Sequence, residues 1–323
     1  MGKYPCRYLR HPYKATPPRC TLPPVMSQPV TIENDALSFE VWPTIGGKVS
    51  SLIDKADHQQ LLFTYPAEIP SEGPQYDLPY QNSWYAGWDE CIPAVAPCRY
   101  AGFPYEGTSV PDHGEIWGLP TTAVPTKNGI TTVWHGLRFG YRLARKLYLQ
   151  DNSIVAEYTL VNLAPFEFRF IWAQHALLAM NAPVELDLGP LAMNFSHDAA
   201  GKKINKPFNF PTCGEDDFSR PKDLPANRGW KLFSADPISA PAVIKYPKRK
   251  RQLSIEYSSE DSLAAYWGIW INTGGWCGTK HFAFEPTTGR FDDLERAVAD
   301  HSVGRIPPLS KWSWMVKWTV ASA

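Results

Sequence analysis

The chain has 323 residues, of which 44% are hydrophobic and 20% are charged, which is ordinary for a globular protein. Its 32 basic and 32 acidic residues balance, so no overall electric field favours a nucleic acid or a membrane surface as partner. No apolar run approaches the roughly 18 residues that a membrane-spanning helix needs. We therefore expect neither a nucleic-acid partner nor a membrane partner.

The first 28 residues are rich in proline and basic residues, and they lack the apolar segment of a secretion signal. They predict an irregular N-terminal arm, followed by a single domain over residues 29–323. The six cysteines do not have the paired spacing of a metal site, and a chain of this length does not need a disulfide framework. We expect free thiols and a cytoplasmic location. The cysteines are Cys6, Cys20, Cys91, Cys98, Cys213 and Cys277.

Short apolar or alternating runs, interrupted by Gly, Pro or Asp, predict strands along most of the chain. In the last run, Trp312, Trp314, Val316 and Trp318 share one face at a period of two residues. The predicted strands cover residues 36–43, 47–54, 60–65, 130–140, 141–150, 153–163, 166–180, 251–259, 263–273, 280–286 and 311–320.

Helical periodicity is scarce, and 31 prolines argue against long helices. Only residues 292–301 predict a short helix, with Asp292 or Asp293 as its N-cap. Residues 201–240 have few periodic apolar positions and predict an irregular insertion, and the basic run 248–251 predicts a solvated turn. The fold class is therefore all-β: one large antiparallel β-sandwich with few short helices.

Four stretches place titratable groups in strand-like, aromatic surroundings: residues 87–93, 111–118, 172–178 and 282–289. Each also has a structural interpretation. His175 could be a hydrogen-bonded core residue, His113 a turn residue, and Glu285 the partner of Arg290. Asp89 and Glu90 could cap a turn.

Other chemistries have little support in the sequence. His113 and Glu115 would share one face of a strand, but a metal site needs a third ligand, and none is evident. The chain has no glycine-rich phosphate loop and no nucleophile elbow. Two His and one Glu among 13 Trp and 15 Tyr suit a sugar site, because aromatic faces stack on sugar C–H faces while His and Glu exchange protons with hydroxyls.

The chain resembles the aldose 1-epimerase (galactose mutarotase-like) superfamily as a divergent member. The resemblance is carried by pieces in the family's order that span residues 30–320. They are "IGGKVSSLID" (45–54), "HG" (113–114), the strand-borne His175, "WINTGGW" (270–276), "FEPTTGRFDDLERA" (284–297) and "IPPLSKWSWMVKWTV" (306–320). The "EPTTG" after the "GGW" stretch is the most specific piece.

The resemblance implies a large antiparallel β-supersandwich, no cofactor and no metal. It implies that Glu285 is the general base, which takes the proton of the anomeric hydroxyl, and that His175 is the general acid, which protonates the ring oxygen. His113 would hydrogen-bond the sugar. The predicted substrate-binding residues are Arg99, Trp88, Asp89, Glu115, Gln174 and Trp276, and Asp216 or Asp217 could supply a further carboxylate.

Two positions depart from the family's pattern, and they indicate a divergent branch with its own sugar. Gln174 stands where an Asn usually precedes the strand-borne His, and Glu115 stands where a second Gly is usual. The first hypothesis is a mutarotase acting on a hexose or a modified hexose, with a small-molecule sugar or an oligosaccharide as its partner, as a monomer or homodimer. A lyase or another carbohydrate-active enzyme on the same site, and a non-catalytic sugar-binding protein, are the alternatives.

Overall fold

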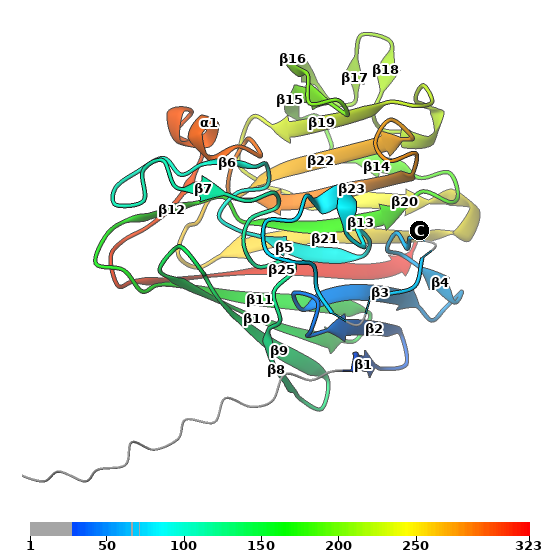
Figure 1. The fold of residues 1–323 in the computed structure, drawn as a ribbon. Coiled ribbons are helices and arrows are strands. Elements are labelled where there is room, and N and C mark those ends of the chain that lie inside the picture. Colours follow the sequence, from blue (N-terminus) through cyan, green and yellow to red (C-terminus); the bar gives the residue numbers. More distant parts are fainter. Residues whose placement is uncertain (1–27, 66, 71) are drawn as a thin grey trace, which may run out of the picture.

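The computed structural model describes residues 28–65, 67–70 and 72–323, and the predicted N-terminal arm lies almost wholly outside these residues. Two large antiparallel sheets account for most of the strands (Figure 1). The larger sheet contains β1 (Val30–Glu33), β2 (Leu37–Trp42), β3 (Lys48–Asp54), β4 (Gln59–Gln60), β5 (Trp88–Cys91), β13 (Ala173–Ala179), β15 (Ala192–Asp198), β16 (Lys203–Asn209), β17 (Thr212–Cys213), β18 (Asp216–Asp217), β19 (Gly229–Ser234), β22 (Tyr266–Thr273) and β23 (Lys280–Thr287).

The second sheet packs against the first and has eight strands in the described part of the chain. They are β8 (Thr122–Pro125), β9 (Gly129–His135), β10 (Tyr141–Gln150), β11 (Ser153–Asn162), β14 (Glu185–Asp187), β20 (Ala242–Tyr246), β21 (Arg251–Ser259) and β25 (Lys311–Ser322). Two small pairs join β6 (Cys98–Arg99) to β7 (Ser109–Val110), and β12 (Phe168–Phe170) to β24 (Gly304–Ile306).

The order of strands in the larger sheet brings distant parts of the sequence together. From one edge to the other, the strand order is β1-β2-β3-β5-β13-β23-β22-β19-β15-β16-β17-β18, with β4 paired to β3. The three central neighbours β5, β13 and β23 therefore come from three separate stretches of the chain, and each carries one of the polar motifs found in the sequence. The sheet therefore places these three motifs side by side.

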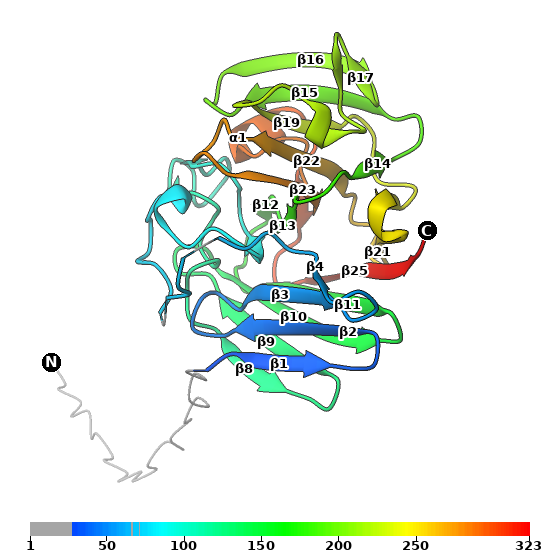
Figure 2. The ribbon, with the colours of Figure 1, turned by 90° about the vertical axis from the view of Figure 1, so that its right-hand side faces the viewer.

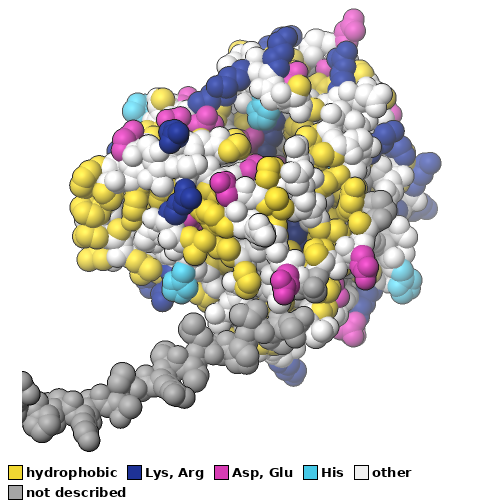
Figure 3. All heavy atoms as spheres, viewed as in Figure 1, with side chains coloured by type: hydrophobic (Ala, Val, Ile, Leu, Met, Phe, Trp, Pro, Cys, Tyr) yellow, Lys and Arg dark blue, Asp and Glu magenta, His cyan; other side chains and the backbone are white. Residues whose placement is uncertain are grey.

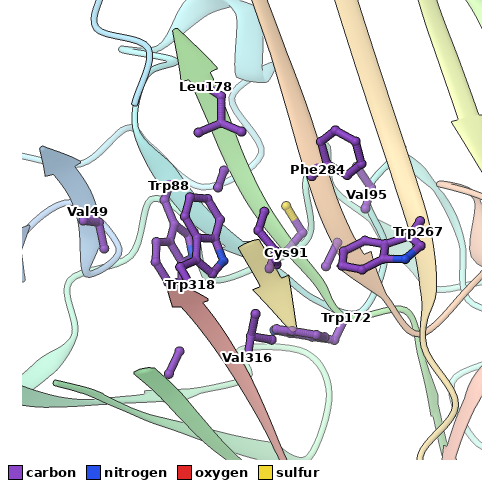
Figure 4. Close-up of a cluster of buried hydrophobic side chains, with 14 of the residues drawn as sticks. Val49, Trp88, Cys91, Val95, Trp172, Leu178, Trp267, Phe284, Val316 and Trp318 are labelled. Atoms are coloured by element: carbon purple, nitrogen blue, oxygen red, sulfur yellow. The ribbon is translucent and has the colours of Figure 1, made fainter. Parts of the chain in front are cut away.

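The core lies between the two sheets and is built from alternating side chains. Trp314, Val316 and Trp318 of β25 are buried, as the period of two residues predicts. Trp88 of the larger sheet stacks on Trp318 of the smaller one, with ring centroids 5.2 Å apart (Figure 4). The prediction of a large all-β sandwich is confirmed.

Helices are few and short, as predicted. The α-helix α1 (Leu294–Ala299) begins after Asp293, whose side chain accepts a hydrogen bond from the Arg296 backbone N–H. The part of the chain that the structure describes also has three 3₁₀ turns, which are η1 (Tyr80–Asn82), η2 (Pro221–Asp223) and η3 (Pro247–Arg249). Among the described residues, no helix is long and apolar enough to cross a membrane.

The prediction of an irregular insertion over residues 201–240 is wrong. This stretch contains β16, β17, β18 and β19, all of which extend the larger sheet. The signal was missed because β16 lies toward the sheet's edge and is mostly exposed, so its sequence KINKPFN shows no apolar alternation. The cysteines at 91, 98, 213 and 277 are free, as expected, while Cys6 and Cys20 lie outside the described residues.

The outer face of the central strands is covered by the segment between β4 and β8. Figure 1 shows this cyan segment in front of β13 and β23, and Figure 2 shows it on the left of the same sheet. In Figure 3, hydrophobic side chains gather at the left edge, near the end where Figure 1 places β12. The exposed large apolar residues of the described chain include Phe103, Leu137, Leu163, Phe166 and Leu309.

Candidate functional site

One row of side chains crosses the outer face of the larger sheet at its centre. Asp89 of β5 is the register partner of His175 in β13. The pairs that flank His175 in the β13–β23 register put it opposite Glu285. Since neighbouring strand residues point to opposite faces, Gln174 and Glu90 point instead into the core. The strand register therefore brings together two of the three predicted catalytic residues.

A cavity of about 220 Å³ opens beside this row. Its wall combines imidazoles, charged groups and aromatic rings, a mixture that suits a polar ligand with apolar faces. The residues that define it chemically are Tyr80, Asp112, His113, His175, His197, Lys231, Trp270, Trp276, His281 and Asp292.

The two predicted catalytic histidines lie against each other in the cavity wall. Their ring centroids are 4.8 Å apart, at an interplanar angle of 82°. Tyr80 stacks on His113 at 3.8 Å and meets the His175 ring edge-on at 5.4 Å. The Tyr80 hydroxyl donates to Asp89 Oδ2 over 2.8 Å, and Lys48 Nζ donates to the same oxygen. A buried ion pair thus anchors the ring that supports both imidazoles.

His113 is also fixed from its own turn. It has a φ of 60°, in the left-handed region, in the Pro-Asp-His-Gly turn, and its Nδ1 lies 2.8 Å from Asp112 Oδ1. The Tyr80 backbone N–H donates to the other Asp112 oxygen over 2.8 Å. Burial alone would raise the pKa of Asp112, but His113 and these hydrogen bonds lower it. The turn and the site interpretations of His113 are therefore compatible.

Glu285 is not the partner of Arg290, which pairs with Asp300 instead. Its carboxylate is fully buried, with Oε2 2.6 Å from Lys231 Nζ and Oε1 3.9 Å from His175 Nε2. Lys231 Nζ also lies 3.2 Å from Asp292 Oδ1, and Asp292 Oδ2 lies 3.6 Å from His197 Nε2. A chain of ionisable groups therefore runs from His175 through Glu285, Lys231 and Asp292 to His197.

The protonation of this chain follows from burial and its neighbours. Burial lowers the pKa of His175 well below its usual range, and His113, Lys231, Lys48 and His281 lower it further. Burial raises the pKa of Glu285, while Lys231 opposes that rise. His175 is therefore neutral at pH 7 in the free protein, and Glu285 has its ionised form stabilised by one ammonium group.

The other predicted binding residues fall in different places. Trp276 lines the cavity, and Asp89 lies beneath it. Trp88 and Gln174 point into the core, where Gln174 contacts Tyr158 and Trp318. These two residues do not face the cavity because they alternate with the residues that do.

Arg99 and Glu115 also lie away from the cavity. Arg99 is exposed on β6 and donates to the backbone carbonyl of Gly107 over 2.8 Å. Glu115 is buried under a different loop and accepts from the Arg138 backbone N–H and the Tyr76 hydroxyl. Asp216 and Asp217 lie on β18, where Asp216 accepts from Trp230 Nε1.

The sequence interpretation missed Lys231, Asp292, Tyr80 and His197. Lys231 carried a usable signal, because it stands among the apolar residues of GWKLFS, where a lysine needs a buried partner. Lys231 lies within residues 201–240, for which the sequence predicts an irregular insertion. Asp292 was assigned only a capping role, which Asp293 fills.

His281 is expected to make folding sensitive to acid. Trp270 Nε1 donates to His281 Nε2 over 3.2 Å, which requires the neutral imidazole, and burial lowers the pKa of His281 to about 3. The unfolded chain binds this proton below pH ~6.5. The unfolding free energy should therefore fall as pH drops from ~6.5 toward ~3, by up to ~1.4 kcal/mol per pH unit for this group.

Urea unfolding at pH 7 and pH 5 checks this expectation. His281→Gln removes the titration and keeps a polar side chain, so the stability loss between the two pH values should be smaller in the variant by about 2 kcal/mol. An equal loss in both proteins would contradict a neutral, buried His281.

No family model matches the chain, and no curated protein is significantly similar to it in sequence. Solved structures do resemble it. The Slr1438 protein from Synechocystis sp. PCC 6803 has a TM-score of 0.70 and 16% identity, over 92% of this chain and 96% of that one. A candidate aldose 1-epimerase from Escherichia coli K12 has a TM-score of 0.66 and 14% identity, over 92% and 99%.

A galactose mutarotase-like protein from Lactobacillus casei ATCC 334 has a TM-score of 0.67 and 16% identity, over 91% of this chain and 100% of that one. Each match covers at least 91% of this chain. The chain therefore has the galactose mutarotase-like fold, matched across most of its length at low sequence identity.

Proposed function

We propose that the chain is a mutarotase-type enzyme that opens and closes the ring of an aldose at its anomeric carbon. The observation that carries this proposal is the pairing of the buried Glu285 with His175, which lines the cavity. Glu285 Oε1 lies 3.9 Å from His175 Nε2, and in the described part of the chain this oxygen has no hydrogen-bond partner. A potential proton acceptor and a potential proton donor thus stand together beside a polar cavity.

The geometry suits the reaction because both reacting oxygens belong to one carbon. Glu285 takes the proton of the C1 hydroxyl while His175 gives a proton to the ring oxygen, and the bond between C1 and the ring oxygen breaks. Rotation about the C1–C2 bond turns the aldehyde, and reclosure with the reverse proton transfers yields the other anomer. An acid and a base that serve two oxygens of one carbon must lie within a few ångströms of each other, as these do.

The pair must carry a single proton for this exchange. His175 is neutral in the free protein, so it can act as the acid only when Glu285 and His175 together carry one additional proton. The two groups then titrate as a unit. The rate should fall when the pair loses that proton and when it binds a second one. A bell-shaped dependence of kcat/KM on pH follows.

The residues and the size of the cavity suit a single sugar ring as ligand. Trp270, Trp276 and Tyr80 offer aromatic surface for the C–H face of a pyranose, and His113, which also lines the cavity, would hydrogen-bond a hydroxyl. At about 220 Å³ the cavity is smaller than typical drug-sized pockets, which favours one ring or the reducing end of a longer sugar.

Anomer exchange of free aldoses, followed by NMR saturation transfer, tests the proposal. The protein should accelerate exchange of at least one aldose in a panel of neutral, phosphorylated and amino-bearing hexoses and short oligosaccharides. His175→Asn should remove the acceleration while retaining the fold by circular dichroism. No acceleration with any sugar of the panel would contradict a mutarotase.

A further inference from the structure

Lys231 reaches Glu285 across an intervening strand. β22 separates their strands, and the residue of β22 that pairs with Glu285 is Gly268, which has no side chain to stand between them. A Cβ on Gly268 would lie 3.3 Å from Glu285 O and 3.4 Å from both Glu285 Cβ and Thr287 Cγ2. The glycine permits a charge contact between non-adjacent strands.

The contact divides the Glu285 carboxylate into two unequal oxygens. Oε2 accepts from Lys231 Nζ over 2.6 Å, whereas Oε1 faces His175 and lacks a hydrogen-bond partner among the described residues. A carboxylate held through one oxygen cannot rotate freely. The other oxygen therefore keeps a fixed direction toward the imidazole.

Lys231 is held in turn by a second carboxylate. Asp292 follows β23 and lies 3.2 Å from the ammonium group, and both Lys231 and Asp292 line the cavity, whereas Glu285 does not. Burial alone would lower the pKa of Lys231, but Asp292 and Glu285 raise it above its usual range, so the ammonium group stays charged. It cannot serve as a neutral amine nucleophile at ordinary pH.

We propose that Lys231, held by Asp292, is a positioning residue that turns Glu285 Oε1 toward His175 and supplies the counter-charge for the carboxylate. The catalytic meaning of this arrangement rests on the proposed function, because it takes Glu285 as the base. The ion triad itself does not depend on which sugar is bound.

The groups that face Glu285 act on it in opposite directions. Burial raises its pKa, Lys231 lowers it, Asp292 raises it, and His113 lowers it. Removing Lys231 should therefore raise the pKa of Glu285, and removing the Asp292 charge should lower it. The titratable or charged groups nearest to Glu285 are Lys231 on β19, Asp292 after β23, His175 on β13, His113 in its turn, and Asp89 and Cys91 on β5.

The first test is the dependence of kcat/KM on pH for the aldose that exchanges fastest. Lys231→Met keeps the length of the side chain and removes its charge. It should move the acid limb of the profile upward by about 1 pH unit or more, because an opposite charge at contact distance shifts a carboxyl by about 1–3 units. Lys231→Arg should keep the limb near its wild-type position, and Asp292→Asn should move it downward.

The second test reads Glu285 directly and needs no substrate. Infrared spectra at pH 7 should show a protonated carboxyl band in Lys231→Met that is absent from the wild type and from the double variant Lys231→Met, Glu285→Gln. The double variant removes both charges of the pair, so it should also fold if the single variant does not. Folding of the double but not the single variant would itself show that Lys231 neutralises a buried charge.

The outcomes separate this inference from the proposed function. If the wild type exchanges no sugar but the infrared band appears, the proposed function fails and Lys231 keeps only its role as the counter-charge of Glu285. If Lys231→Met folds with an unchanged acid limb and no new band, the positioning role is overturned even if the enzyme is a mutarotase.

Discussion

Glu285→Gln is expected to lower the rate of anomer exchange by about 10²–10⁴-fold, the usual contribution of one well-placed acid or base. Glutamine has the same shape but cannot accept the C1 proton. Lys231 keeps Asp292 as a partner, 3.2 Å away, so the loss should appear in turnover rather than in folding. NMR saturation transfer measures the rate, and circular dichroism with urea unfolding measures the fold.

Glu40→Gln is the matched control for this change. Glu40 lies on β2 of the same sheet, accepts from Trp42 Nε1 and Ser50 Oγ, and is not part of the cavity wall. The Glu40→Gln variant should catalyse anomer exchange at the wild-type rate. Undiminished turnover in a folded Glu285→Gln protein would remove Glu285 as the base.

Arg145→Met is expected to cost about 3–5 kcal/mol of unfolding free energy, because it leaves a buried carboxylate without its counter-ion. Arg145 Nη1 lies 3.0 Å from Glu90 Oε1, and both side chains are buried between the two sheets. Burial raises the pKa of Glu90, and Arg145 opposes that rise. Three neutral donors would remain, from Trp88, Tyr158 and Trp172, but none of them carries a charge.

Arg142→Met provides the control on the same strand. Arg142 points to solvent on β10, so its replacement should change stability by no more than about 0.5 kcal/mol. Urea unfolding at pH 7 measures both variants. Equal stability of the two variants would mean that the Glu90–Arg145 pair does not hold the sheets together.

The sequence predicts the sandwich well where strands have one buried face. β10 and β25 alternate cleanly between buried and less buried residues, and their boundaries are close to the predicted ones. It predicts β16 poorly, because a mostly exposed strand buries too few side chains to leave an alternating pattern. The difference comes from what each strand packs against, which is information about the tertiary structure.

In the candidate site, too, the sequence predicts features of single strands but not contacts between distant strands. Glu285 and His175 could be identified because each interrupts an apolar strand and because the surrounding motifs resemble a known family. The Lys231 contact could not be predicted, since it depends on two strands that are separated by β22 and meet over Gly268. The prediction that Trp88 and Gln174 bind the substrate is wrong because strand alternation turns both side chains into the core.

A crystal structure with an aldose bound tests the proposed roles of Glu285 and His175 directly. We expect a sugar ring against Trp276, with its C1 hydroxyl within about 3.2 Å of Glu285 Oε1 and its ring oxygen within about 3.2 Å of His175 Nε2. A sugar seated in this cavity with C1 turned away from both residues, or bound elsewhere on the molecule, would contradict it.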